Sequence, residues 1–276
     1  MKSRMMCLVL LVLAQAGACV QASTSWRVVR QRHGWQLLRD GEAFYIKGAV
    51  AWNRFDVLRR CGGNAVRTAA SKAKLDMAQK EGLAVMVNLP VYGERRGVDL
   101  GDESRVDAQR EKVLSVVREL KDHPAVMFWA IGNELDYIPG ESGHHPMLWE
   151  RLNDLAAAIK AIDDKHPVMT VVGTGRFEKK VQEIARECAE MDLLGINCYG
   201  DIDSVTKLAR KYWPKPYAIT EWGPTGHWQV PKTRWRAPLE QTSSEKAAAI
   251  RDRYVNTILA DRANCLGAFV FYWSEK

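Results

Sequence analysis

Two glutamates that end apolar stretches are the residues of this chain best suited to chemistry. Glu134 closes the stretch 125–134, and Glu221 follows the stretch 216–220. Both stretches are largely apolar, which is typical of parallel strands buried on both faces. A hydrophobic strand gains nothing structurally by ending in a carboxylate, so the placement favours a functional pair at the carboxyl ends of two strands. Two solvated loop acids are the alternative interpretation.

Two carboxyl groups facing one cleft are what retaining glycoside hydrolysis requires. One of them protonates the leaving oxygen, while the other attacks the anomeric carbon as a carboxylate. The acid needs a raised pKa, which partial burial and a neighbouring negative charge would both provide. If the two glutamates converge, the sequence therefore predicts a reaction at a glycosidic bond.

Alternating strand-like and helix-like segments must position this pair. The stretch Trp26 to Arg39 alternates and predicts a short N-terminal β-hairpin. Eight strand-like segments follow, at 44–50, 64–68, 83–89, 125–131, 168–172, 192–197, 217–220 and 266–272. Seven helix-like segments separate them, at 54–61, 72–81, 105–121, 147–162, 178–188, 204–211 and 244–260. Because parallel strands need crossover helices and eight such units close a barrel, we predict an α/β fold, a (β/α)8 TIM barrel whose eighth helix is missing.

In such a barrel the loops that follow the strands share one face. Glu134 follows the fourth strand and Glu221 the seventh, so both can point into one cleft. The segment 222–243 is the longest irregular stretch and is rich in Trp, Pro and Thr. A loop of this length in a compact domain is usually functional, so we expect it to contribute to the site.

Residues 1–22 have the pattern of a secretory signal peptide. Lys2 and Arg4 precede the apolar run 5–14, and small residues follow it. The run is too short and wrongly flanked for a membrane-spanning helix. We therefore predict an exported protein, periplasmic or extracellular, whose catalytic domain occupies residues 23–276.

Four cysteines follow this leader, and none has the close paired spacing of a zinc site. In an oxidising compartment Cys61 and Cys265 could form a disulfide, while buried free thiols are the alternative. The segment 16–19 faintly resembles a lipoprotein cleavage box, so a lipid anchor at Cys19 is a second interpretation of the leader. We expect no membrane contact unless that anchor is present.

The charge balance argues against a nucleic-acid partner. The formal net charge is +7, and loss of Lys2 and Arg4 with the leader lowers it to +5. The remaining Lys and Arg are scattered along the expected helices rather than grouped, which indicates a solvated surface. A slight preference for acidic polysaccharide is compatible with this composition.

Four segments resemble the catalytic barrel of clan A glycoside hydrolases, and they are most similar to family 2. These segments are Gly62–Thr68, Trp129–Glu134, Asn197–Tyr199 and Thr220–Gly223. The resemblance covers nearly all of the chain after the leader, in the same order. Two departures are a short hairpin where β-sandwich domains usually precede the barrel, and Ala51-Trp52-Asn53 where His-Glu often follows the first strand.

The resemblance implies a role for each matching residue. Glu134 matches the general acid/base, and Glu221 matches the nucleophile. Asn133 matches the residue that hydrogen-bonds the sugar 2-hydroxyl. Arg67 matches an arginine beneath the nucleophile, whose charge keeps that carboxylate ionised, and Tyr199 matches a tyrosine whose hydroxyl reaches it.

Aromatic residues are expected to complete the sugar site. Trp273 matches the final-strand aromatic that forms a floor beneath the sugar, because a ring stacks on the C–H face of a pyranose. Loop aromatics on the same face are further candidates for substrate contact: Trp52, Tyr92 and Trp228. The pair His144–His145 has no carboxylate or cysteine partner at a recognisable metal spacing, so we expect no metal and interpret the pair as surface or substrate-contact residues.

We therefore predict an exported retaining β-glycosidase that hydrolyses O-glycosidic bonds of a poly- or oligosaccharide by double displacement, without a cofactor. A glycan transglycosylase on the same barrel is one alternative, because a sugar hydroxyl can replace water as acceptor. A non-catalytic carbohydrate-binding barrel is another. A third is a piece of a larger, membrane-associated protein that processes glycans.

Overall fold

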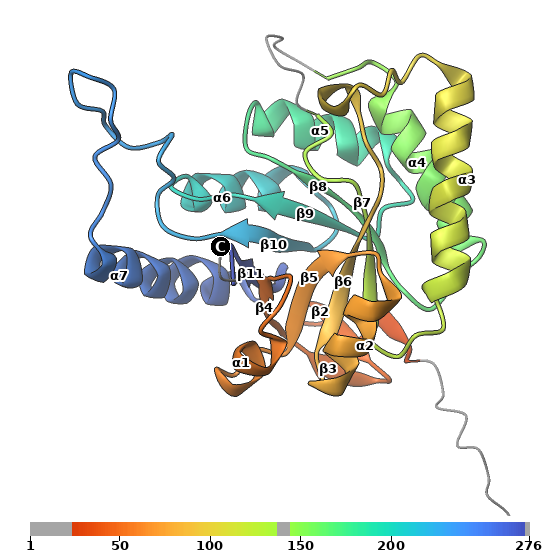
Figure 1. Cartoon of the computed structure of the whole chain (residues 1–276), viewed down its shortest axis with the longest axis horizontal. Helices are drawn as coiled ribbons and strands as arrows, with labels where there is room; N and C mark the ends of the chain where they lie inside the picture. Colours follow the sequence, from red (N-terminus) through yellow and green to blue (C-terminus); the bar gives the residue numbers. More distant parts are fainter. Residues whose placement is uncertain (1–23, 137–143, 274–276) are drawn as a thin grey trace, which may run out of the picture.

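The computed structural model describes residues 24–136 and 144–273, so the expected signal peptide and Cys19 lie outside the described residues. A small antiparallel sheet comes first and a closed parallel barrel follows (Figure 1). The sheet contains β1 (Trp26–Gln31), β2 (Gly34–Arg39) and β3 (Glu42–Phe44). The expected hairpin thus gains a third strand, because Phe44 pairs antiparallel with Leu37 instead of starting the barrel.

The predicted TIM barrel is confirmed. Its strands, in chain order, are β4 (Ile46–Val50), β5 (Ala65–Ala69), β6 (Ala84–Leu89), β7 (Val126–Ile131), β8 (Val168–Val172), β9 (Leu193–Asn197), β10 (Tyr217–Trp222) and β11 (Cys265–Val270). Each strand pairs in parallel with its neighbours in the chain, and β11 pairs with β4 to close the barrel.

The helices between the strands follow the expected order. They are α1 (Phe55–Arg60), α2 (Lys72–Lys80), η1 (Glu94–Arg96), α3 (Glu103–Leu120), α4 (Leu148–Lys160), α5 (Phe177–Glu187), α6 (Ile202–Tyr212) and α7 (Ser243–Arg253). The last predicted helix changes pitch after Arg253, with a π-helical turn η2 (Tyr254–Ile258) and a 3-10 turn η3 (Leu259–Asp261). Several ends are fixed by caps; at α7, Thr242 and Glu245 form a capping box.

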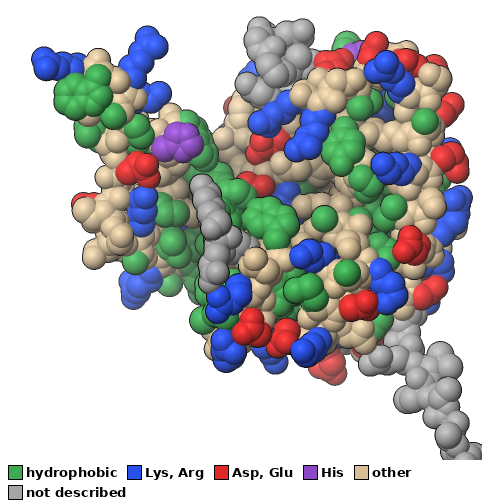
Figure 2. Space-filling view, viewed as in Figure 1, with side chains coloured by type: hydrophobic (Ala, Val, Ile, Leu, Met, Phe, Trp, Pro, Cys, Tyr) green, Lys and Arg blue, Asp and Glu red, His purple; other side chains and the backbone are tan. Residues whose placement is uncertain are grey.

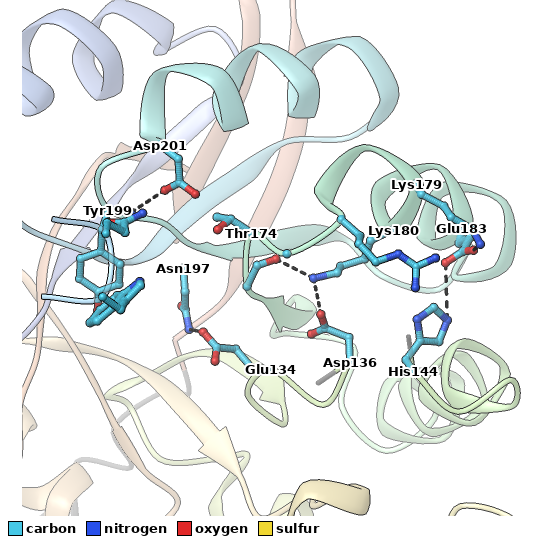
Figure 3. Close-up of a pocket in the computed structure, with 15 residues that line it drawn as sticks. Glu134, Asp136, His144, Thr174, Lys179, Lys180, Glu183, Asn197, Tyr199 and Asp201 are labelled. Atoms are coloured by element: carbon cyan, nitrogen blue, oxygen red, sulfur yellow. Dashed lines mark hydrogen bonds and ion pairs between the residues drawn. The ribbon is translucent and has the colours of Figure 1, made fainter. Parts of the chain in front are cut away.

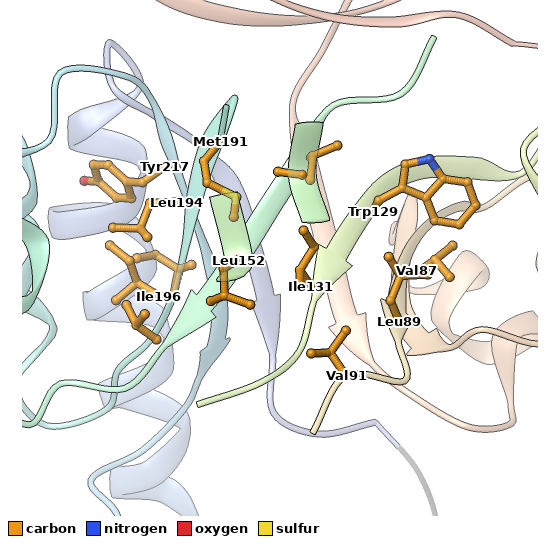
Figure 4. Close-up of a cluster of buried hydrophobic side chains, with 14 of the residues drawn as sticks. Val87, Leu89, Val91, Trp129, Ile131, Leu152, Met191, Leu194, Ile196 and Tyr217 are labelled. Carbon is orange, nitrogen blue, oxygen red and sulfur yellow. The ribbon is translucent and has the colours of Figure 1, made fainter. Parts of the chain in front are cut away.

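Side chains of most barrel strands alternate between two apolar clusters. In β6, Ala84 and Met86 join an inner cluster, while Val85 and Val87 join an outer cluster between strands and helices. Figure 4 shows part of the outer cluster. Trp26 from the small sheet joins the inner cluster beside the first residues of several strands, so this sheet closes the amino-terminal end of the barrel. The opposite, carboxyl end is left open for a site.

The four cysteines are all free thiols, so the disulfide considered between Cys61 and Cys265 is absent. Cys61 is exposed at the end of α1, whereas Cys265 is completely buried at the start of β11. Within the described residues, no helix is both long and apolar enough to cross a membrane.

Barrel closure depends on a close backbone approach at Gly267, which pairs with Ile46. Its φ is +121°, and a Cβ atom there would lie 2.2 Å from the Ile46 carbonyl oxygen. We expect Gly267→Ala to lower the free energy of unfolding by about 3 kcal/mol or more, because β11 must move away from β4.

Gly62→Ala is the matched control, since Gly62 also has a positive φ of +87° but faces open space. This variant should lower the free energy of unfolding by only about 1 kcal/mol, because only the left-handed backbone conformation becomes unfavourable. Urea unfolding followed by circular dichroism measures both values. Equal losses would mean that the contact between β11 and β4 does not govern closure.

Candidate active site

Arg67, in β5, is the centre of the candidate site. Its side chain is 2% exposed and lies at the carboxyl end of the barrel, where it donates to groups from four other strands or the residues that follow them. Nε donates to Asn88 Oδ1 at 3.1 Å. One terminal nitrogen donates to Asn197 Oδ1 at 3.2 Å, to the Thr220 carbonyl at 3.0 Å and to Glu221 Oε1 at 3.1 Å. Burial lowers the pKa of Arg67, and the Glu221 carboxylate opposes that effect.

Glu221 is fixed on both of its carboxylate oxygens. Oε1 pairs with Arg67, and Oε2 accepts the hydroxyl of Tyr199 at 3.1 Å. Burial raises the pKa of Glu221; Arg67 opposes this shift, the charge of Glu134 adds to it, and the Tyr199 hydroxyl also opposes it. Burial likewise raises the pKa of Tyr199, so its hydroxyl stays protonated and donates. The arrangement favours a carboxylate held in one orientation, with a nearby cation that stabilises its charge.

Glu134 is presented by an unusual backbone turn after β7. Gly132 has φ +70° and Glu134 has φ +50°, so two residues adopt left-handed conformations within three positions. The Glu134 amide donates to the Val171 carbonyl at 2.9 Å, which ties this turn to β8. A non-glycine residue in this region is strained, and such strain is commonly found where a functional side chain must be aimed.

The Glu134 side chain belongs to the same hydrogen-bond network as Glu221. Its Oε1 accepts Asn197 Nδ2 at 2.9 Å, and its Oε2 lies 3.7 Å from a terminal nitrogen of Arg95. Its side chain is 30% exposed, against 14% for Glu221, so it has more access to solvent. The Asn197 amide and the Arg67 guanidinium connect the two carboxylates, because Asn197 donates to Glu134 and accepts from Arg67, which in turn donates to Glu221.

Asn133 completes the polar base of the cleft. Its Oδ1 accepts the second terminal nitrogen of Arg67 at 2.5 Å and Asn197 Nδ2 at 3.0 Å. With its oxygen occupied by two donors, its amide nitrogen is the group left to bind a ligand oxygen. This is compatible with the contact to a sugar hydroxyl that the resemblance implies.

A cavity of about 480 Å³ opens beside Glu134 (Figure 3). Tyr199 and Trp228 line one side, with their rings 5.1 Å apart at nearly a right angle. The other side is polar and comes from the turn after β7, the loop after β8 and the first turns of α5. An aromatic wall facing hydrogen-bonding groups suits a sugar, which has apolar C–H faces and polar edges.

Lys180, in α5, holds the turn that carries Glu134. Its ammonium forms a buried ion pair with Asp136 and donates to the Gly173 carbonyl at 2.7 Å. Gly173 lies against the Glu134 carboxylate, since a Cβ there would come within 3.3 Å of Oε1. Lys180 therefore fastens two loops around one acid. Neither Lys180 nor Asp136 was predicted from the sequence, because Lys180 is one of many lysines on helices and Asp136 is a loop acid.

The structure brings six predicted residues together: Arg67, Asn133, Glu134, Tyr199, Glu221 and Trp228. For two other predicted residues, Trp52 and Tyr92, the described contacts involve residues outside this group. The ring of Trp52 packs edge-on against Tyr272, with centroids 5.4 Å apart. Tyr92 lines a separate groove between α3 and α4.

Trp273 is half-buried and packs on the outer apolar cluster. Its amide donates to the Val50 carbonyl, so it follows β11 at the seam with β4. The ring of Phe271, two positions earlier, lies 6.3 Å from that of Tyr199.

Asn88 and Thr220 are functional-site residues that sequence reasoning did not select. Asn88 binds Arg67, and the Thr220 hydroxyl donates to Asn197 Oδ1 at 2.8 Å. A polar residue near the end of an apolar strand was the available signal in both cases. Asn197, the last residue of β9, contacts Arg67, Thr220 and Glu134 through its side chain.

Three side chains that could hold a cation gather near His145: the ligand atoms of Glu94, Asp99 and His145 lie within 4.8 Å of one another. However, His145 Nδ1 accepts the backbone N–H of Met147 at 3.2 Å. A neutral ring then carries its proton on Nε2, the atom that lies 3.7 Å from Glu94. That tautomer suits a hydrogen bond to Glu94 and not a metal bond through Nε2.

A parallel eight-stranded barrel with two carboxylates, an arginine and aromatic rings at its carboxyl end defines the class of TIM-barrel glycoside hydrolases. The family described as "Glycosyl hydrolases family 2, TIM barrel domain" matches residues 31–230. The chain therefore belongs to glycosyl hydrolase family 2, through its TIM barrel domain.

Comparison with individual proteins gives more distant matches. The chain is 26% identical over 211 residues to a β-glucuronidase of Pongo abelii, a match that covers 66% of this chain and 30% of that protein. A β-galacturonidase structure from Eisenbergiella tayi superimposes with a TM-score of 0.64 at 16% identity, over 91% of this chain and 47% of that one. A β-D-glucuronidase structure from Dictyoglomus thermophilum gives 0.63 at 19% identity, over 92% and 48%. These structures share the fold, and the chain spans less than half of each of these proteins.

The hydrogen bond from Tyr199 to Glu221 can be tested by titration. We expect Tyr199→Phe to raise the pKa of Glu221 further, because the variant removes a donor that favours the charged carboxylate. Carboxyl carbon resonances of labelled glutamate, followed by NMR over pH, report this value.

Tyr212→Phe is a matched control, since the hydroxyl of Tyr212 also donates to a glutamate, Glu178, on the outside of the barrel. It should leave the titration of Glu221 where it is in the parent. An unchanged or lowered pKa in Tyr199→Phe would contradict the interpretation of this contact.

Proposed function

We propose that this chain is a retaining β-glycosidase that hydrolyses O-glycosidic bonds by double displacement. The observation that carries the proposal is the connection of Glu134 to Glu221 through Asn197 and Arg67 at the carboxyl end of the barrel. In this proposal Glu221 attacks the anomeric carbon, and Glu134 protonates the leaving oxygen. Glu134 then removes a proton from water, which releases the sugar from Glu221.

The electrostatics of the two carboxylates support this assignment of roles. Glu221 is held by Arg67 and Tyr199, which stabilise a charged nucleophile and leave it no freedom to rotate. Glu134 lacks such a buried cation, and it is the more exposed of the two. Once Glu221 carries the sugar, Glu134 is the carboxylate left to act as the base toward water.

The substrate and the location are parts of the same proposal. Relatives named β-glucuronidase and β-galacturonidase make β-uronides the first substrates to test. We also propose export, from the leader-like sequence at residues 1–22. Transglycosylation remains the second candidate, and the aromatic wall at Trp228 is the feature that favours it, since an acceptor sugar can stack there.

Replacing either carboxylate should nearly abolish turnover. We expect Glu221→Gln and Glu134→Gln each to lower kcat/KM by about a thousandfold or more on an aryl β-glycoside that the parent cleaves. Circular dichroism should show a folded protein in both cases, since Gln keeps the size and one acceptor oxygen of Glu. Glu111→Gln, on the solvent side of α3, is the control and should retain parental activity.

The two variants should also differ from each other. An activated leaving group such as dinitrophenolate needs no proton, so Glu134→Gln should still form the glycosyl-enzyme and then stall. A burst of one equivalent of phenolate, with a covalent adduct seen by mass spectrometry, is the expected result. Parental turnover in either variant would overturn the assignment of roles.

The stereochemistry of the product separates the possible mechanisms. Double displacement inverts the anomeric carbon twice, so the first sugar released from a β-glycoside should be the β-anomer. Proton NMR of the anomeric region, recorded before mutarotation, measures this. An α-anomer as the first product would exclude a covalent intermediate on Glu221. Binding of glycans without cleavage of any would instead favour a carbohydrate-binding barrel.

A further inference from the structure

A projecting β-hairpin formed by residues 231–239 is the feature that the proposed reaction does not use. It belongs to the loop between β10 and α7, and it stands away from the barrel in Figure 1. We define these residues as the hairpin arm. We propose that the hairpin arm binds the anionic groups of a polysaccharide whose chain extends outward from the cleft. The inference rests on the proposed function for the identity of the ligand as a glycan.

The hairpin arm is held together by its own hydrogen bonds. Lys232 and Pro238 form an antiparallel bridge. The amide of Thr233 donates to the Ala237 carbonyl at 2.8 Å, and that of Leu239 donates to the Pro231 carbonyl at 2.9 Å. The tip side chains are therefore presented from a defined turn and need little ordering when a ligand arrives.

The side chains at the tip are cationic and aromatic. Lys232, Arg234 and Arg236 are exposed, and the segment 223–239 contains no Asp or Glu. Trp235 is 69% exposed, and the Arg234 guanidinium lies 5.6 Å from the centre of its ring. Figure 2 shows this group of Lys and Arg side chains around hydrophobic atoms at the end of the projection. An indole face beside guanidinium groups can stack on a pyranose while the cations bind its carboxylate or sulfate.

The loop that forms the hairpin arm also supplies an exposed aromatic residue to the cavity wall. Among the described residues, three of the eight exposed large hydrophobic side chains lie between positions 228 and 239: Trp228, Trp235 and Leu239. Trp228 stands at the root of the arm and forms the cavity wall with Tyr199. Gln229 fixes this root, because its side-chain oxygen accepts the amides of Gly200 at 2.9 Å and Gly226 at 3.1 Å.

This shared loop favours a glycan over other anionic partners. A chain that occupies the cavity beside Glu134 passes Trp228, and the next groups along the loop are the cations of the hairpin arm. Binding to a charged lipid surface or to a nucleic acid would explain the cationic tip. It would not explain why the same loop also lines the cavity. Carboxylate and sulfate groups share the chemistry that the arm would recognise, and the test below distinguishes them.

Binding can be measured without cleavage in a Glu221→Gln background, by calorimetry with three polymers: hyaluronate for carboxylates, dextran sulfate for sulfates and dextran as the neutral case. We expect tighter binding of one anionic polymer than of dextran, with the preferred polymer identifying the anionic group.

Replacing Lys232, Arg234 and Arg236 together by Gln should weaken that binding by about tenfold, because three exposed ion pairs are lost. Trp235→Ala should weaken it by about threefold or more through lost stacking.

A second triple variant controls for net charge. Arg110, Lys112 and Arg118 are exposed on α3, at the other side of the barrel, and their replacement by Gln removes the same charge. This variant should bind the anionic polymer as the parent does. With Glu221 intact, the hairpin triple variant should hydrolyse a small aryl glycoside at the parental rate, since the arm lies outside the cleft.

Three results would overturn the inference: equal binding by the hairpin triple variant and the parent, equal losses in the two triple variants, or binding only to phosphatidylserine vesicles and to no glycan. Failure of the proposed reaction would look different. In that case the two Glu→Gln variants would keep their turnover, or the parent would have none, while the calorimetric difference between the two triple variants would persist.

Discussion

The buried guanidinium of Arg67 is the interaction on which the arrangement of the site depends. A charge that is 2% exposed is tolerated only when its donors are satisfied, because an unpaired buried charge is strongly unfavourable. Its partners are Asn88 near the end of β6, Asn133 beyond β7, Asn197 at the end of β9 and Glu221 in β10. One side chain therefore sets the relative positions of five strand ends, and those strand ends carry the site.

Asn197 extends this control from one carboxylate to the other. Its oxygen accepts Arg67 and Thr220, which fixes the orientation of the amide. Its nitrogen is thereby aimed at Asn133 and Glu134. The same network treats the two acids differently: Glu221 contacts a cation directly, whereas Glu134 receives only the amide nitrogen and a distant, exposed Arg95. Unequal environments for two nearby carboxylates are how a site obtains one charged and one protonated group at the same pH.

Much of this fold could be predicted from the sequence because the strands are short, apolar and evenly separated by helices. Seven of the helices and all eight barrel strands lie near their expected positions, since burial on both faces leaves a strong signal. The end of the last predicted helix was less accurate, because nothing in the pattern marks the π-helical turn at Tyr254–Ile258. The antiparallel β3 was also missed, since a three-residue strand carries almost no periodicity.

The candidate site was predictable where motif residues follow strands and unpredictable where contacts depend on side-chain geometry. Glu134, Glu221, Arg67 and Tyr199 converge as expected, because carboxyl ends of parallel strands share one face. The residues that follow the final strand were harder to place, because the contacts of Phe271 and Trp273 depend on the backbone path after β11, which the sequence pattern does not fix. The contact of Lys180 with Asp136 joins a helix to a loop forty-odd positions away, and no spacing rule relates them.

Rigidity and recognition are divided between two kinds of element in this molecule. The strand ends and the Lys180–Asp136 ion pair hold Glu134 in a left-handed backbone conformation. Such a conformation is unfavourable by about 1–2 kcal/mol, so a mobile loop would relax out of it. In the loop after β10, Arg253 and Gln229 fix the root through Gly223, Thr225 and Gly200. The hairpin arm beyond it is held by its own hydrogen bonds, and most of its side chains are exposed. Changes of sequence at the tip therefore leave the carboxylates in place, so the ligand range of the barrel can vary without disturbing the geometry around Arg67.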